Sequence, residues 1–200
     1  MILRPEILQH ANIPKPLHGL SPRVIKGQAW WDKTRKAVYN KQDYCCIACG
    51  IHKSKAKYRQ HIEAHEAYTI DYINGFMEIK EIIGLCHSCH SFIHCGRLSV
   101  MLGKGEVNYS KFKDVMLHGF RVLRKADLEP WFGQCMTYIS ALLANGETAS
   151  RELVMRSSEL QRKQEVGQMQ QDWSEWYLLL DGKRYYSKFK SYEDWLNYYK

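Results

Sequence analysis

Two Cys-x-x-Cys pairs, Cys46–Cys49 and Cys86–Cys89, carry the clearest chemistry in this 200-residue chain. Each pair has the spacing at which a tight turn directs two thiolates at one ion. Together they predict a structural Zn²⁺ site with four cysteine ligands, because two paired spacings are unusual for unmetallated core thiols. The long gap between the pairs predicts that the intervening segment forms structure of its own. The remaining cysteines are Cys45, beside the first pair, and Cys95 and Cys135, which we expect to be buried free thiols.

Histidines gather in the same region, since six of the nine lie between Cys46 and Cys95. His90 and His94 are four residues apart, so a helix beginning near Cys86 would present both on one face. This placement favours a second cation site. The alternatives are a solvated helical face, or a histidine that replaces a cysteine at the zinc.

Around these pairs the chain resembles the HNH endonucleases, in the branch whose ββα-metal core is held together by a four-cysteine zinc site. The resemblance covers about half of the chain. It rests on the first Cys-x-x-Cys pair, the acidic and histidine-bearing segment Arg59–Glu66, the run Gly84–His90, and Ile93-His94 followed by Cys-Gly-Arg-Leu. It implies an α+β fold with an N-terminal helix before the zinc-held ββα-metal core, then a helical region and a small C-terminal ββα element.

The resemblance also implies an activity, the metal-dependent hydrolysis of phosphodiester bonds in DNA by an endonuclease or nickase, with 5′-phosphate and 3′-hydroxyl products. In this family the first strand usually ends in Asp-His or His-His, where the first residue binds metal and the second is the base. The matching pair here is His65-Glu66. On this alignment His65, His90 and His94 hold a catalytic Mg²⁺ or another divalent cation, and Glu66 is the base.

A shift of the alignment by one residue makes His65 the base, and then Glu63 or His61 must help to bind the metal. The chain also departs from the family pattern at Glu81, which stands where the family has its middle asparagine. These departures support an alternative function. The chain would then be a catalytically degenerate HNH-fold zinc protein that binds nucleic acid or inhibits another protein as an accessory factor.

The net charge of +8 favours a polyanionic partner, and with the HNH pattern it predicts DNA, with RNA as an alternative. Two groups of basic residues are candidate phosphate contacts. The first group lies on the expected N-terminal helix, and the second lies among tyrosines near the C-terminus. For the second group the competing interpretation is structural, namely a hairpin whose aromatic side chains close the helical core. The candidates are Lys33, Arg35, Lys36, Lys183, Arg184, Lys188 and Lys190.

Cysteines in metal-like pairs indicate a reducing compartment. No apolar run approaches the roughly 20 residues of a membrane span, and the N-terminus lacks the layout of a signal peptide. The sequence therefore predicts a cytoplasmic protein of a bacterial or phage-infected cell, without a membrane partner.

The expected elements fall into four consecutive regions. Residues 1–20, rich in proline, are expected to form an extended arm, and residues 21–100 the HNH domain. In that domain we expect a helix from Ser21-Pro22 to about Lys41, short strands at 57–64 and 67–73, a turn at Asn74-Gly75, and a helix that ends around Gly96.

The last two regions are residues 101–170 and 171–200. The first should contain three amphipathic helices, the third of which runs from about Thr148 towards Met169. The apolar faces of these helices should form the core or the surface of a homodimer. The second should form a strand, an Asp181-Gly182 turn, a second strand and a helix capped near Ser191. This last region is a candidate accessory DNA-binding element.

Overall fold

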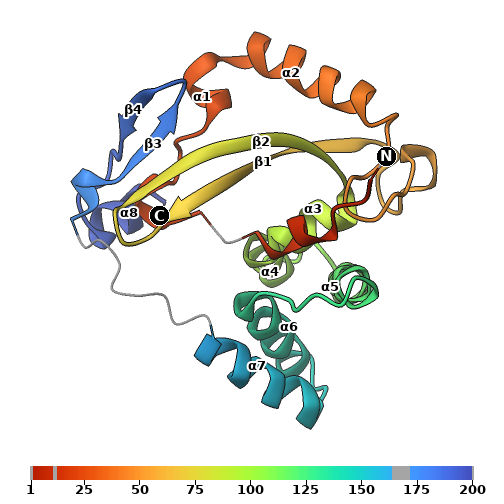
Figure 1. The fold of residues 1–200 in the computed structure, drawn as a ribbon. Helices are drawn as coiled ribbons and strands as arrows, with labels where there is room; N and C mark the ends of the chain where they lie inside the picture. The colour runs from red at the N-terminus through yellow and green to blue at the C-terminus, as the bar shows by residue number, and fades with distance from the viewer. Residues whose placement is uncertain (1, 11–12, 164–171, 200) are drawn as a thin grey trace. The chain divides into compact units, whose positions relative to one another are not determined.

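A computed structural model describes residues 2–10, 13–163 and 172–199, and it has an α+β fold with a small four-stranded sheet (Figure 1). The predicted α+β class is confirmed. The chain divides into two compact units that interleave along the sequence. The first unit comprises Met1–His10, Tyr39–His65 and Gly84–Glu165, and the second comprises Ala11–Val38, Glu66–Ile83 and Val166–Lys200.

Strands β1 (Ile62–Asp71) and β2 (Phe76–Cys86) are neighbours in the sheet and are joined by a tight turn. The Asp71 carboxylate accepts hydrogen bonds from the backbone of Ile73 at 3.0 Å and of Asn74 at 2.9 Å, and Gly75 adopts a φ of 70°. The predicted Asn74-Gly75 turn is therefore confirmed. The two strands predicted at 57–64 and 67–73 are instead one strand, because Tyr58 has a φ of 73° and the extended chain begins only at Ile62.

Helix α3 (His87–Ile93) follows β2 directly, with Cys86 as its N-cap. The prediction that this helix continues to Gly96 is wrong. It ends at His94, where a ψ of 38° leaves the helical region, and a second helix, α4 (Cys95–Gly103), contains Gly96. His94 therefore lies at the junction of the two helices, where it caps α3 by donating its backbone N–H to the His90 carbonyl at 3.2 Å.

The three amphipathic helices predicted for residues 101–170 are present as α5 (Tyr109–Lys125), α6 (Phe132–Ala144) and α7 (Arg151–Lys163). Asn108 caps α5 by accepting a hydrogen bond from the Lys111 backbone at 2.9 Å. The predicted continuation of the third helix towards Met169 lies outside the described residues. The buried face of α5 consists of Phe112, Val115, Met116, Gly119 and Leu123.

Gly119 lets α5 approach α3 closely. A Cβ atom at this position would lie 2.2 Å from the ring of Phe92, which is fully buried in α3. We therefore expect Gly119→Ala to lower the free energy of unfolding by about 1–3 kcal/mol, in spite of the higher helix propensity of alanine. Gly96→Ala is the matched control, because nothing lies within 4 Å of its Cβ position, and it should be neutral or stabilising. Urea unfolding of both variants measures the difference, and equal stabilities would contradict the close approach.

The N-terminal segment is not the extended arm predicted for residues 1–20. It contains two short 3-10 helices, η1 (Pro5–Gln9) and η2 (Lys15–Leu17). Leu8 is fully buried in the first unit, and its carbonyl accepts a hydrogen bond from Gln134 at 2.7 Å. The prolines start these turns instead of keeping the chain extended.

The helix predicted from residue 22 to about Lys41 is two helices, α1 (Pro22–Lys26) and α2 (Gln28–Lys41). Gly27 separates them with a φ of 85°, a conformation that interrupts the hydrogen-bonding pattern of a helix. The predicted cap is confirmed, since Ser21 Oγ accepts a hydrogen bond from the Val24 backbone at 3.3 Å.

The C-terminal region forms strands β3 (Tyr177–Leu180) and β4 (Lys183–Tyr186) and helix α8 (Tyr192–Tyr198), as predicted. Strand β3 pairs in parallel with the start of β2 and antiparallel with β4, which gives the order β1-β2-β3-β4. Two further 3-10 turns are η3 (Lys53–Lys55) and η4 (Trp173–Glu175). The hairpin supplies much of the core of the second unit, which consists of Leu17, Tyr68, Met77, Trp176, Leu178 and Leu180.

Candidate metal centres

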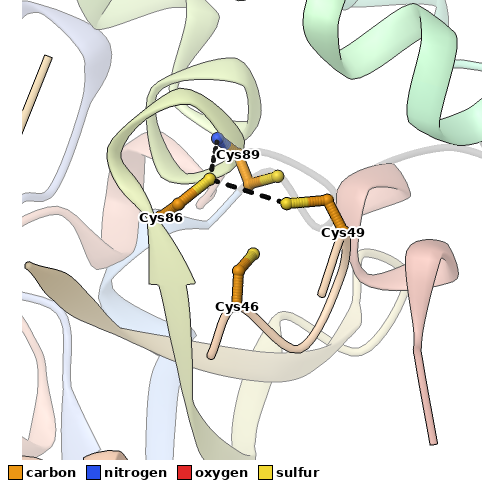
Figure 2. Close-up of side chains that lie close together, drawn as sticks. All are labelled: Cys46, Cys49, Cys86 and Cys89. Carbon is orange, nitrogen blue, oxygen red and sulfur yellow. Dashed lines mark hydrogen bonds between the residues drawn. The ribbon is translucent and has the colours of Figure 1, made fainter. Parts of the chain in front are cut away.

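Four cysteine side chains converge in the first unit (Figure 2). Cys46 and Cys49 come from a turn, and Cys86 and Cys89 come from the junction of β2 and α3. Their sulfur atoms all lie within 4.8 Å of one another. The Cys49 and Cys86 sulfurs are 3.8 Å apart, which is close to the separation of about 3.8 Å for two ligands in a tetrahedron with Zn–S bonds of about 2.3 Å. The cluster could hold a metal ion such as Zn²⁺.

The turn that carries Cys46 and Cys49 is bound to β2 through a buried glutamine. Gln42 is 7 % exposed, and its amide donates to the carbonyl of Gly84 at 3.0 Å and accepts from the Gly84 backbone N–H at 2.7 Å. The backbone N–H of Ile47 donates to the same carbonyl at 3.0 Å. These bonds hold the two halves of the cysteine cluster together, two residues before Cys86.

The four thiols compete for protons because they are buried close together. Hydrogen bonds from Cys49, Cys86 and Cys89 hold the pKa of Cys46 far below its usual range. The same contacts, together with burial, raise the pKa of Cys86 and Cys89 above the usual range. A divalent cation would bind all four cysteines as thiolates and offset half of their total charge.

His118 on α5 is an additional neighbour of the cysteine cluster that the sequence did not indicate. Its Nε2 lies 3.3 Å from Cys89 Sγ, within hydrogen-bonding distance for sulfur. An imidazole N–H at this distance stabilises thiolate charge, as outer-shell hydrogen bonds do at metal sites.

We expect His118→Ala to weaken zinc binding by about 10-fold or more without unfolding the protein. Competition with a chromophoric chelator measures the affinity. His52→Ala is the control, because His52 is exposed and the hydrogen bonds described for its side chain are to Ser54. Equal zinc affinities for the two variants would contradict the proposed contact between His118 and the thiolate.

Three histidines form a second group in the same unit. His65 on β1, His90 on α3 and His94 at the end of α3 have ligand nitrogens that all lie within 4.8 Å of one another. The ring centroids of His90 and His94 are 4.7 Å apart, and those of His65 and His94 are 5.1 Å apart. The sequence prediction that these three residues form one group agrees with this geometry.

The environment of His65 fits a ligand at this site. Its side chain is 3 % exposed, and its Nε2 has no hydrogen-bond partner among the described residues. Buried polar nitrogens without a partner are rare in folded proteins, and a metal ligand is one explanation for such a nitrogen.

Burial is the main cause of lowered pKa values among these histidines. It acts together with nearby His90 and His10, and lowers the pKa of His94 to about 3. Burial and the neighbouring histidines also lower the pKa of His65 well below its ordinary value. Both imidazoles are therefore neutral near pH 7, which is the form that binds metal ions.

Glu63 and His10 complete the surroundings of this group. The carboxylate of Glu63 on β1 accepts hydrogen bonds from His87 Nδ1 at 2.8 Å and from His90 Nδ1 at 2.6 Å. Burial raises the pKa of Glu63, but the two histidine bonds outweigh it and hold the pKa well below the usual range. The ring of His10, in which the sequence gave no signal, lies 5.3 Å from that of His65.

Searches against protein-family models, curated proteins and solved structures found no match. The interpretation of this site therefore rests on its own residues and geometry.

The other predicted catalytic residues, Glu66 and Glu81, lie on β1 and β2 and are half-buried. Neither belongs to the two metal-ligating groups found among the described residues. The exposed His61 lies 3.8 Å from Glu63 and is also outside both groups. The catalytic roles of the two glutamates stay predictions.

The basic residues proposed for nucleic acid lie on two surfaces of the second unit. On α2, Lys33 and Lys36 are exposed, and Arg35 forms an ion pair with Asp32 at 2.7 Å. In the C-terminal region the Arg184 guanidinium lies 4.7 Å from the centre of the Tyr177 ring, and Lys188 Nζ lies 3.5 Å from that of Tyr198. Lys183 and Lys190 are exposed as well. Contact of any of these residues with phosphates stays a prediction.

Among the described helices, none combines the length and the apolar character that a membrane crossing requires.

Proposed function

We propose that this protein is a metal-dependent nuclease of the HNH type that hydrolyses phosphodiester bonds in DNA. The observation that carries the proposal is the convergence of His65, His90 and His94, of which His90 directly follows Cys89 of the four-cysteine cluster in the sequence. The order β1, β2, α3, with His65 on the first strand and His90 on the helix, supports a ββα-metal core. The cysteine cluster, with Zn²⁺ bound, would hold the start of α3 in place.

The donor atoms of the histidine group favour a transition metal over Mg²⁺. Three imidazole nitrogens suit Zn²⁺, Ni²⁺, Co²⁺ or Mn²⁺, whereas Mg²⁺ prefers oxygen ligands in octahedral geometry. Glu63 is not part of this ligand group, and its two oxygens accept hydrogen bonds from His87 and His90. When bound, such an ion would polarise the scissile phosphate and stabilise the charge on the leaving oxygen.

The general base is assigned to Glu66 or to His65 by the two alignments with the HNH pattern. Neighbouring residues on a strand point to opposite faces, so Glu66 points away from the side of β1 on which His65 meets His90 and His94. Glu66→Gln separates the assignments. If Glu66 is the base, this variant loses cleavage but still binds metal; if His65 is the base, the variant keeps its activity. Rates of plasmid nicking and metal affinities, measured on the same preparations, distinguish the two.

A panel of substrates and ions tests the proposed activity. Double- and single-stranded DNA and RNA are incubated with Mg²⁺, Mn²⁺, Ni²⁺ or Zn²⁺, and the ends of any product are identified. We expect DNA cleavage with a transition metal, leaving 5′-phosphate and 3′-hydroxyl ends. Faster cleavage of RNA would change the substrate class. Binding of DNA without cleavage in any ion would support the accessory-factor alternative instead.

A further inference from the structure

Glu63 connects strand β1 to two histidines of helix α3. Its Oε1 lies 2.8 Å from His87 Nδ1 and its Oε2 lies 2.6 Å from His90 Nδ1. The three side chains are 16 %, 11 % and 22 % exposed, respectively, so little water competes for these bonds. Distances this short are typical of hydrogen bonds to an ionised carboxylate.

The two hydrogen bonds determine where each imidazole carries its proton. An ionised carboxylate has no proton to donate, so the histidine Nδ1 atoms must be the donors. The Nε2 of His90, when the ring is neutral, is then left with a lone pair, which is the group that binds a metal ion. The same bond restricts rotation of the His90 ring.

We infer that Glu63 is a positioning residue for the histidine metal site. It fixes the tautomer and orientation of His90, while the bond to His87 keeps the carboxylate from turning towards the ion. This inference rests on the proposed function in placing a cation at His65, His90 and His94. Arrangements in which a carboxylate accepts the second N–H of a ligating histidine recur at protein metal sites.

The other contacts of Glu63 are weaker. Arg59 and His61 approach the carboxylate only to 3.7 Å and 3.8 Å, and both side chains are 54 % exposed. Ion pairs at such exposed positions contribute little. The effect of replacing Glu63 should therefore come from the loss of its bonds to His87 and His90.

Glu63→Gln is the sharpest substitution, because it keeps the shape of the side chain and changes its hydrogen bonding. The amide has one oxygen and one N–H₂ group, so it can accept from only one of the two histidines in their original tautomers. We expect Ni²⁺ affinity to fall by about 10- to 100-fold, with the zinc content and the thermal unfolding midpoint nearly unchanged. Glu106→Gln is the control for net charge, because Glu106 is exposed and lies in a turn after α4.

Ni²⁺ titration calorimetry of the zinc-loaded protein, together with long-range ¹H–¹⁵N NMR of the histidine rings, tests the inference. We expect wild-type His90 to carry its proton on Nδ1, and Glu63→Gln, but not Glu106→Gln, to lose Ni²⁺ affinity. Equal affinities of the wild type and Glu63→Gln would overturn the inference. If Glu63→Gln does not fold, the wild-type NMR spectrum tests the inference by itself. A neutral His90 with its proton on Nε2 would overturn the inference. If the histidines do not form a metal site at all, the result is different: the wild type and His90→Ala then bind Ni²⁺ equally, or neither binds it.

Discussion

Cys46→Ser or Cys89→Ser is expected to abolish zinc binding at the four-cysteine cluster and to unfold the first unit. Both sulfurs are fully buried, and the cluster joins the turn at residues 46–49 to the junction of β2 and α3. Zinc binding contributes on the order of 10 kcal/mol to folding in isolated zinc-finger peptides, which is comparable to the whole stability of a domain. Circular dichroism with elemental analysis measures both losses.

Cys45→Ser is the matched control for this prediction. Cys45 adjoins Cys46 but is half-buried, and its sulfur lies 3.5 Å from the carbonyl of Asp43 and outside the cluster. It should keep its zinc and its unfolding midpoint. Retention of zinc and of full stability in Cys46→Ser would show that the four-cysteine assignment is wrong.

His90→Ala is expected to abolish metal-dependent cleavage, by on the order of a thousandfold or more. His90 belongs to the histidine group and also donates a hydrogen bond to Glu63, so its loss removes a ligand and disturbs the positioning of the site. The fold should survive, because the His90 side chain is 22 % exposed and supplies no ligand to the cysteine cluster.

His52→Ala provides the control for general effects of histidine removal. Cleavage rates, zinc content and Ni²⁺ affinity are compared for the two variants. A His90→Ala protein that cuts DNA as fast as the wild type would place the chemistry elsewhere in the chain.

The cysteine pairs and the amphipathic helices could be predicted because their signals are local. Cys-x-x-Cys spacing brings two thiolates to one turn whatever the rest of the chain does. The apolar spacing in α5 and α6 likewise predicted helices that the structure contains. Asp181-Gly182 and Ser191 marked a turn and a helix cap through chemistry that acts over a few residues.

Features that depend on contacts between distant segments could not be predicted in the same way. Glu63 meets His87 and His90 only after β1 and α3 pack together, and His118 reaches Cys89 from a different helix. The break at His94 was also missed, because Gly96 is a common stop signal but is accommodated inside α4. Thus the sequence indicated the candidate metal ligands more fully than the groups that surround them.

Nicking of supercoiled plasmid by the zinc-loaded protein tests the central claim most directly. Protein in excess over plasmid is incubated with Mn²⁺ or Ni²⁺, beside His90→Ala of equal zinc content. We predict that the wild type converts supercoiled DNA to the nicked or linear form and that His90→Ala leaves it intact. Intact plasmid with the folded wild type in every divalent ion, or equal nicking by both proteins, would contradict the account.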